Sequence, residues 1–508
     1  MPLERIIKYK YLIFILLGIF NALPFVFESL SIISWFSYSL FLIFLFKIIK
    51  NLNGKEVFIC ITFFYFAYYF VTFNFFAILY PLSFVGIGYV ASFFLLLFAW
   101  VLMALFFSLA VSLVTCFIIK CSYNTTTKII SVSLAFLLVE YLQSFVFPWA
   151  RFSLPQYNMP LLIQSASLFG PYFVDFLMFL CNALIVVTVF SYKKKFIPAV
   201  IFILIFLSNL ILGVLLINSS NNSTQEAKVM LVQGNVLTDQ KWEGKSSFSI
   251  YLNESISDYQ GADLVIWSET AIPTRLNESI AISNTLTEFA SCYDNEMIVG
   301  AFYSDKSGKL YNGAYHIHKG GISDKIYLKR RLVPFGEYLP FGDILKRLPY
   351  LDNINIISTD LHAGDSTSIM DTRAGKVGSL ICFDSIFHNL ARDTVNDGAE
   401  ILAVVTNDSW YKDSSAVKLH NAQSVWRAVE NGRWVVRCAN SGVSSIITNK
   451  GTIVKYLPAL VRGTITENVR FIEEKTLYTI IGDVFIIPLF FCFFVLAFKK
   501  KSALIKKH

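Results

Sequence analysis

Charged residues are scarce in this chain of 508 residues: they make up only 15% of it, whereas hydrophobic residues make up 55%. Soluble globular domains usually carry about 25% charged residues, so the scarcity argues against an ordinary soluble protein. Aromatic residues are not scarce, since the chain has 49 Phe and 25 Tyr. This abundance argues against intrinsic disorder.

Cysteine patterns typical of metal or redox sites are also lacking. The eight cysteines form no CxxC motif and no Cys/His spacing of the kind that binds a metal. His316 and His318 face the same side of a predicted strand, but no third ligand accompanies them. We therefore expect no metal and no cofactor. Three cysteines fall between residues 218 and 476, and this odd number implies at least one that is free or paired elsewhere.

The few charges are unevenly distributed along the chain. Residues 218–476 hold 26 basic and 29 acidic side chains, a balance that fits a soluble domain. The rest of the chain holds 17 basic and 6 acidic side chains, which fits membrane segments with basic edges. The pI of about 8.9 therefore gives no support for nucleic-acid binding.

Long hydrophobic runs predict eight membrane-spanning helices, because a helix needs about 20 apolar residues to cross the ~30 Å hydrocarbon core. They are expected near residues 11–27, 28–48, 56–79, 88–119, 129–147, 172–191, 196–217 and 477–498. The predicted domains are a membrane domain of seven helices at 1–217, a soluble domain at 218–476, and an eighth helix with a basic tail at 477–508.

Every second loop between these spans is basic. Lysines and arginines cluster at both termini and in the loops after the second, fourth and sixth spans, whereas the alternate short loops hold only Arg151. Such residues collect on the cytoplasmic side of bacterial membranes. Both termini are therefore predicted to be cytoplasmic, and residues 218–476 to lie outside, in the periplasm of a Gram-negative bacterium.

The soluble domain alternates short β-branched runs with helical stretches. Strands are predicted at AKVMLVQ (227–233), DLVIWS (263–268), EMIVGAFY (296–303), KVGSLIC (376–382) and EILAVVT (400–406). Near-continuous apolar strands separated by helices predict an α/β fold whose sheets are covered on their faces.

Three reactive side chains follow predicted strands, where the functional groups of α/β sheets collect. They are the carboxylate of Glu269 after LVIWS, the amine of Lys329 after KIYL and the thiol of Cys382 after VGSLI. A thiol at a strand-to-helix junction lies near the positive end of the helix dipole, which favours the thiolate. A carboxylate can accept its proton, and an ammonium can stabilise a tetrahedral oxyanion. Together they predict an acyl-transfer site, although each alone is also compatible with a buried thiol or a surface charge.

The strings around these residues resemble the Glu-Lys-Cys motifs of the nitrilase superfamily. They are LVIWSETAIP around Glu269, YLKRRLVPFGEYLP around Lys329 and GSLICFDSIF around Cys382, in the same order, followed by TNDSWY at 406–411. LVQGNVLTDQKWEG at 231–244, FPWARF at 147–152 and the arrangement of the spans resemble the apolipoprotein N-acyltransferase family more specifically.

This resemblance implies a polytopic α-helical membrane protein with a nitrilase-like αββα sandwich domain. It implies a ping-pong acyltransferase of the bacterial inner membrane, with a phospholipid as acyl donor and a diacylglyceryl apolipoprotein as acceptor. Cys382 would form a thioester, Glu269 would act as general base and later as acid, and Lys329 would stabilise the oxyanion. The partners expected are these two lipids and the bilayer, with no nucleic acid, and the protein is expected to be a monomer.

The resemblance also assigns supporting residues. Glu337 matches a second carboxylate that supports the site, and Trp242 matches a tryptophan near the acyl pocket. The family usually has Cys-Tyr-Glu where this chain has Cys382, Phe383 and Asp384. Asp384 is one methylene shorter than Glu and therefore reaches its partner differently or through water, and Phe383 keeps the ring without the hydroxyl.

Several further residues have both a functional and a structural interpretation. Asn407 and Trp410 follow a strand and are predicted to line the substrate pocket, although an ordinary turn fits equally. The apolar stretch 340–358 is predicted to be a mobile arm that gates lipid entry, or else a core helix and loop. The gate would include Leu345, Leu348 and Leu351.

Other polar residues are expected to be structural. His420 is expected to be a structural histidine, because Glu269 already supplies the base. Arg427, Glu430 and Arg433 have helical spacing and predict an ion-pair network. Glu140 and Asp175 lie in or beside predicted spans and are expected near the membrane interface rather than on a proton path.

Two alternative functions remain compatible with the sequence. The first is a membrane-tethered amidase with the same triad, which would release the acyl group to water. The second is a transporter with a ligand-binding outer domain, but no pair of polar or Gly/Pro-broken spans favours it.

Overall fold

A computed structural model describes residues 3–82, 87–121, 124–191, 196–220, 223–236, 245–340 and 361–498. The chain forms two compact units. The first, called here the membrane unit, comprises residues 1–77, 95–218 and 481–508. The second, called here the α/β unit, comprises residues 78–94 and 219–480.

Seven of the eight predicted membrane spans have a counterpart in the described residues. Among the described residues, seven helical stretches are long and apolar enough to cross a membrane: Glu28–Asn51, Gly54–Thr72, Tyr89–Cys121, Thr125–Gln143, Pro171–Phe190, Phe196–Ile217 and Leu477–Leu496. The first predicted span corresponds to a helix of 17 residues, Lys10–Val26. Its length of about 26 Å lies at the lower end of what a bilayer requires.

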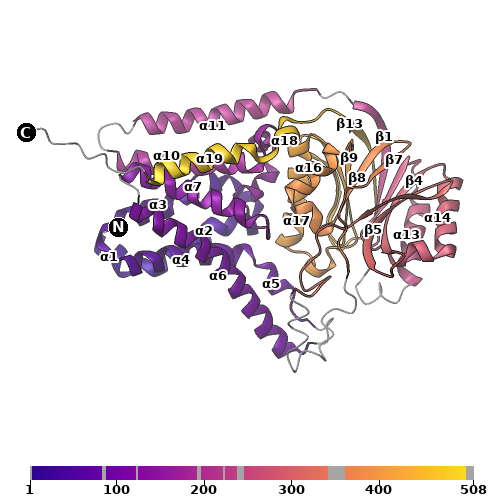
Figure 1. Cartoon of the computed structure of the whole chain (residues 1–508), viewed down its shortest axis with the longest axis horizontal. Coiled ribbons are helices and arrows are strands. Elements are labelled where there is room, and N and C mark those ends of the chain that lie inside the picture. The colour runs from indigo at the N-terminus through magenta and orange to yellow at the C-terminus, as the bar shows by residue number, and fades with distance from the viewer. Residues whose placement is uncertain are drawn as a thin grey trace, which may run out of the picture. The chain divides into compact units, whose positions relative to one another are not determined.

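The seven stretches and the 17-residue helix contain the longer helices drawn in Figure 1. They are α2 (Lys10–Val26), α3 (Ser34–Ile48), α4 (Gly54–Thr72), α6 (Tyr89–Cys121), α7 (Thr125–Gln143), α10 (Pro171–Phe190), α11 (Phe196–Ile217) and α19 (Ile486–Phe498). Shorter helices are α1 (Leu3–Lys8), α5 (Phe75–Ile78), α8 (Pro160–Ile163), α9 (Ala166–Phe169) and α18 (Leu477–Ile481).

Aromatic packing and a few polar contacts hold the helices of the membrane unit together. Tyr38 on α3 and Tyr65 on α4 are buried, and their hydroxyl oxygens lie 2.8 Å apart. Asn182 on α10 accepts the backbone N–H of Ser39 at 2.8 Å and donates to the carbonyl of Ser34 at 3.0 Å. Such side chains satisfy each other across helices where water is absent.

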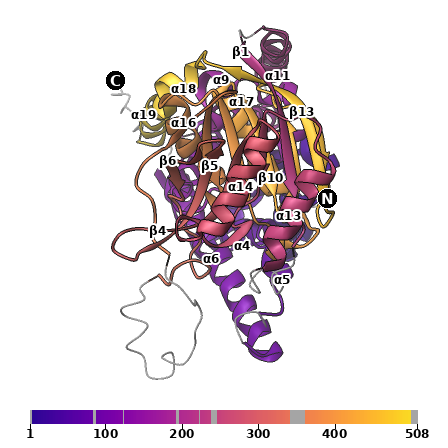
Figure 2. The ribbon, with the colours of Figure 1, turned by 90° about the vertical axis from the view of Figure 1, so that its right-hand side faces the viewer.

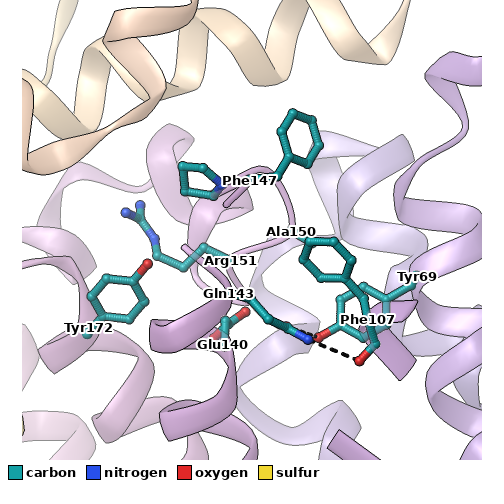
Figure 3. A pocket seen from close by; sticks show the side chains of 9 residues that line it. Tyr69, Phe107, Glu140, Gln143, Phe147, Ala150, Arg151 and Tyr172 are labelled. Carbon is teal, nitrogen blue, oxygen red and sulfur yellow. Dashed lines mark hydrogen bonds between the residues drawn. The ribbon is translucent and has the colours of Figure 1, made fainter. Parts of the chain in front are cut away.

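The loop after α7, which contains the FPWARF string, is buried within the membrane unit. Glu140 Oε1 accepts the backbone N–H of Phe152 at 2.6 Å, and Asp175 Oδ1 accepts that of Ser153 at 2.6 Å. Arg151 Nε lies 3.8 Å from Asp175 Oδ2. Non-helical backbone needs such partners when it lies among apolar helices. Glu140 and Arg151 also line a small pocket with Gln143 and Tyr172 (Figure 3).

Two mixed sheets form the centre of the α/β unit. In the described residues one sheet has seven strands, in the order β13-β1-β2-β4-β5-β6 with β3 beside β4. These are β1 (Ser223–Gln233), β2 (Leu264–Trp267), β3 (Ile272–Arg275), β4 (Glu296–Ser304), β5 (Leu310–His318), β6 (Gly321–Leu328) and β13 (Gly463–Ile472). The six-stranded sheet has the order β12-β11-β10-β9-β8-β7. Its strands are β7 (Ile369–Thr372), β8 (Gly375–Ile381), β9 (Ile401–Thr406), β10 (Trp434–Ala439), β11 (Ser444–Ile447) and β12 (Ile453–Leu457).

Helices cover the outer face of each sheet and produce an αββα sandwich, as predicted (Figure 1). Helices α13 (Lys245–Ser257) and α14 (Ile280–Cys292) lie on the seven-stranded sheet, and Figure 2 shows them in front of it. Helices α16 (His388–Asn396) and α17 (Ser415–Asn431) lie on the other sheet.

Both faces of the central strands are apolar because both are covered. Along β1, Val229 and Leu231 join the core between the sheets, whereas Met230 and Val232 join the core beneath α13 and α14. The alternation follows from the two-residue period of a strand. It explains why these strands appear in the sequence as continuous apolar runs.

Candidate active site

The three predicted reactive residues each follow a strand, but the strands belong to different sheets. Glu269 follows β2 and Lys329 follows β6, both in the seven-stranded sheet. Cys382 follows β8 in the six-stranded sheet and begins a short 3-10 helix, Cys382–Ile386. The site therefore forms where the ends of strands from the two sheets meet.

Lys329 links two carboxylates at the centre of this site. Its Nζ lies 2.9 Å from Glu269 Oε1 and 2.8 Å from Glu337 Oε1, and its side chain is only 1% exposed. Burial alone lowers the pKa of Lys329, but attraction by Glu269 and Glu337 outweighs it and the pKa stands well above its usual value. The lysine is therefore a firmly held ammonium.

Neighbouring groups orient both carboxylates. Glu337 Oε2 accepts the backbone N–H of Val333 at 2.8 Å, four residues before it. Asn312 on β5 donates from Nδ2 to Glu269 Oε1 at 2.7 Å and lies 3.5 Å from Glu337 Oε1. The sequence analysis did not single out Asn312. Its one signal was a polar amide within a strand of mostly apolar and aromatic residues.

The thiol of Cys382 is the neutral partner in this cluster. The residue keeps part of its surface accessible. Loss of hydration raises the pKa of its thiol far above the usual value, Glu269 raises it further, and Lys329 and a hydrogen bond to Thr406 only partly oppose this. Burial and the neighbouring carboxylate thus act against the thiolate that the helix dipole was expected to favour.

Cys382 also has an unusual backbone conformation. Its φ is 49°, and Thr270, directly after Glu269, has a φ of 44°. Residues with a β-carbon adopt this left-handed region at a cost, so its occurrence beside two reactive groups points to function. Gly300 on β4 lets the Glu269 segment approach, because a β-carbon there would lie 2.2 Å from the carbonyl oxygen of Ser268.

Asp384 connects the nucleophile loop to the segment after Lys329. Its Oδ1 accepts the backbone N–H of Arg331 at 2.7 Å, and its Oδ2 accepts the Tyr327 hydroxyl at 2.8 Å and the N–H of Ile381 at 3.2 Å. Burial raises the pKa of Asp384 to about 6. The shorter side chain therefore makes direct contacts without a bridging water. Phe383 packs edge-to-face on Phe387 at 5.2 Å.

The other predicted pocket residues have separate surroundings. Asn407 Oδ1 accepts from Asn440 Nδ2 at 3.1 Å, which ties it to the loop after β10. Trp410 lies in a 3-10 turn, Ser409–Tyr411, and is 37% exposed. Trp242 and the predicted gate residues Leu345, Leu348 and Leu351 lie outside the described residues.

His420, which was expected to be structural, lies next to the nucleophile loop. Its Nε2 is 3.3 Å from the carbonyl oxygen of Cys382, and its Nδ1 is 2.7 Å from Asp408 Oδ1. Cys382, Asp408 and His420 each offer one potential metal-ligand atom, and these three atoms lie within 4.8 Å of one another. Arg437 Nη2 bonds the other oxygen of Asp408 at 2.7 Å and would repel a cation there.

The predicted ion pairs on α17 are partly present. Arg427 Nη2 bonds Glu430 Oε1 at 2.7 Å, and both side chains are fully buried. Arg433 instead donates to backbone carbonyls, including that of Ala399 at 2.8 Å. The helical spacing therefore identified one pair, whereas Arg433 lies beyond the end of the helix and binds backbone.

Two family models match the chain, one in each part of it. Residues 228–473 match the carbon-nitrogen hydrolase family, and residues 17–184 match the apolipoprotein N-acyltransferase N-terminal domain. Among solved structures, Nit3 of Saccharomyces cerevisiae, a member of branch 10 of the nitrilase superfamily, is 19% identical, with 50% of this chain and 93% of that chain covered and a TM-score of 0.38.

Curated relatives match across both parts. The apolipoprotein N-acyltransferase of Geobacter metallireducens is 31% identical over 378 residues, which cover 70% of this chain and 71% of that protein. That of Haemophilus ducreyi is 28% identical over 394 residues, covering 73% of this chain and 75% of that protein. With its membrane helices, its αββα sandwich and these relatives, the chain belongs to the apolipoprotein N-acyltransferase family.

Proposed function

We propose that this acyltransferase carries an acyl chain from a phospholipid to the α-amino group of a lipoprotein's N-terminal diacylglyceryl-cysteine, through a thioester on Cys382. The observation that carries the proposal is the Lys329 ammonium, bonded to Glu269 at 2.9 Å and to Glu337 at 2.8 Å beside a neutral thiol. Base, oxyanion donor and nucleophile thus occur in one cluster.

In the first half-reaction, Glu269 accepts the proton of the Cys382 thiol as Sγ attacks the carbonyl carbon of a phospholipid ester. The high pKa of the thiol makes this base necessary, because little thiolate exists beforehand. The Lys329 ammonium stabilises the oxyanion. The carbon–oxygen ester bond then breaks, and the departing glyceryl oxygen takes the proton from Glu269, which releases a lysophospholipid.

In the second half-reaction, the free α-amino group of the lipoprotein attacks the thioester carbon. Glu269 accepts a proton from the nitrogen, the carbon–sulfur bond breaks, and that proton returns to Sγ. The products are an amide on the lipoprotein and the original thiol. The thioester preserves the activation of the acyl group, so no nucleotide is consumed.

Glu337 and Asn312 have orienting roles in this scheme. Glu337 holds Lys329 through a second ion pair, and Asn312 donates to Glu269 Oε1. Asn407 and Trp410 are proposed to line the substrate pocket, which the partial exposure of Trp410 supports.

The protein is a bacterial membrane protein by its helices and its family. We propose further that the α/β unit faces the periplasm and that both termini are cytoplasmic. The alternation of basic and non-basic loops supports this orientation. A membrane-impermeant thiol reagent should then label an engineered cysteine at Ser307, in an exposed turn of the α/β unit, in intact spheroplasts.

The chemical proposal is tested by intact mass spectrometry after incubation with phospholipid. The wild type should gain an acyl adduct that hydroxylamine removes, and the Cys382→Ala variant should not. Addition of a diacylated lipopeptide should move the acyl group onto the peptide amine. Release of free fatty acid instead would favour the tethered amidase, and an adduct on another cysteine would refute the assignment of Cys382.

A further inference from the structure

A buried charge network lies beneath the nucleophile and is not used by the mechanism above. Arg437 Nη2 lies 2.7 Å from Asp408 Oδ2, and Asp408 Oδ1 lies 2.7 Å from His420 Nδ1. The side chains of Arg437 and Asp408 are 0% exposed and that of His420 is 3% exposed. The three residues come from β10, the turn after β9, and α17, so the fold converges on this point.

Asp408 is an anion within this network. Burial opposes its ionisation, but His420 and Arg437 outweigh burial and hold the pKa of Asp408 well below its usual range. Thr406 also donates to Asp408 Oδ1 at 3.1 Å. Gly442 leaves room for the carboxylate, because a β-carbon at that position would lie 2.2 Å from Asp408 Oδ2. Donation from His420 Nδ1 to Asp408 and from Nε2 to the Cys382 carbonyl together require the imidazolium form of the ring, whose charge the Asp408 carboxylate balances.

The opposite edge of the imidazole faces the nucleophile loop. His420 Nε2 lies 3.3 Å from the carbonyl oxygen of Cys382 and 3.2 Å from Ser385 Oγ. Ser385 Oγ donates to the same Cys382 carbonyl at 2.7 Å. Arg427, seven residues after His420 on α17, donates to the carbonyl of Ile386 at 3.1 Å. One helix thus supports both ends of the loop that begins with the nucleophile.

The backbone conformation of Cys382 explains why this support is needed. Its φ of 49° is costly for a residue with a β-carbon, so surrounding contacts must hold it. A relaxed φ would rotate Sγ away from Glu269 and Lys329. Displacement of a reacting atom by about 1 Å can cost about 10²-fold in rate.

We propose that His420 is a positioning residue: anchored by Asp408 and Arg437, it holds the left-handed backbone of Cys382 through Ser385 and the Cys382 carbonyl, and so keeps Sγ facing Glu269 and Lys329. This inference deepens the proposed function and rests on it. His420 exchanges no proton with the substrate in this role. It differs from an ordinary core histidine because its removal changes the reaction rate of correctly folded molecules.

The test compares His420→Ala and His420→Gln with the wild type in single-turnover formation of the acyl-enzyme, per folded molecule. We expect His420→Ala to lower the rate constant by about 10²-fold, with the phospholipid concentration for half-maximal rate and the shape of the pH profile unchanged. Gln retains an N–H near the position of Nε2 and should recover about tenfold of the loss.

His316 provides the matched control. It is also a buried histidine of the α/β unit bonded to a carboxylate, with Nε2 3.1 Å from Glu296 Oε2. His316→Ala should lower the thermal stability without changing the acylation rate. An equal loss of rate in this variant would show that any buried histidine matters, and would overturn the proposal.

A second variant and a second readout keep the test decisive. If His420→Ala does not fold, Ser385→Ala should still slow acylation by about tenfold, since it removes one of the two contacts to the carbonyl. Alkylation of Cys382 by iodoacetamide needs no lipid and should slow in parallel. Unchanged rates in folded variants, or a displaced pH profile, would overturn the positioning role. A wild type that is alkylated but never acylated would instead refute the proposed function.

Discussion

Each unit of the molecule contains a buried basic side chain beside two glutamate or aspartate side chains, and the two clusters differ in how closely the carboxylates bond the cation. In the membrane unit, Glu140 and Asp175 accept backbone N–H groups at 2.6 Å, and Arg151 approaches Asp175 only to 3.8 Å. In the α/β unit, Glu269 and Glu337 bond Lys329 directly.

This difference separates a structural cluster from a reactive one. In the membrane unit both carboxylates accept main-chain N–H groups and so fix a loop, without a close ion pair. Carboxylates that share an ammonium beside an accessible thiol hold charge where a reaction can use it. The same residue types therefore serve two purposes. Substitutions in the cluster of the α/β unit should lower the acylation rate of folded protein, whereas substitutions in the cluster of the membrane unit should leave it unchanged.

The largest expected effect comes from replacing Glu269. Glu269→Gln retains the size and the acceptor for Lys329 but cannot accept the thiol proton. We expect acyl-enzyme formation to fall by about 10²–10⁴-fold, because the buried thiol stays neutral. Single-turnover mass spectrometry measures this loss.

Glu140→Gln is the matched variant in the other unit. Its amide oxygen can still accept the N–H of Phe152, so we expect the acylation rate of folded protein to remain unchanged. A fall in that rate comparable with the fall in Glu269→Gln would remove the distinction between the two clusters.

Replacing Glu337 should have an intermediate effect. In Glu337→Gln, Lys329 keeps Glu269 and loses its second anionic anchor, while the amide oxygen still accepts the N–H of Val333. We expect the rate of acyl-enzyme formation to fall by about 10–10²-fold. A loss as large as that of Glu269→Gln would assign proton transfer to Glu337 as well, and an unchanged rate would exclude it from the site.

Asp384 is an intermediate case in this comparison, because it lies in the α/β unit but bonds mainly backbone N–H groups. Its raised pKa of about 6 means that the carboxylate accepting the N–H groups of Arg331 and Ile381 is lost as the pH falls through about 6. We expect the acylation rate to decline below that pH, by less than the loss in Glu337→Gln. The inflection should be absent in Asp384→Asn, and its persistence there would assign it to another group.

Much of this architecture could be predicted because it depends on local patterns. Apolar runs of about 20 residues identify membrane helices, and continuous β-branched runs identify strands covered on both faces. The five strands predicted around 227–233, 263–268, 296–303, 376–382 and 400–406 correspond to β1, β2, β4, β8 and β9. The positions of Glu269, Lys329 and Cys382 after strands follow from the same patterns.

The sequence by itself thus determined the membrane helices, the α/β character of residues 218–476 and the strand ends that carry the reactive side chains. Only the tertiary structure placed Asn312 against Glu269, which is 43 residues away, and Arg437 and His420 on Asp408 beneath Cys382. It also decided that the thiol is neutral, against the local helix dipole. The physical reason is that burial and pairwise electrostatics depend on which distant segments come into contact, and a local sequence pattern does not show which segments do.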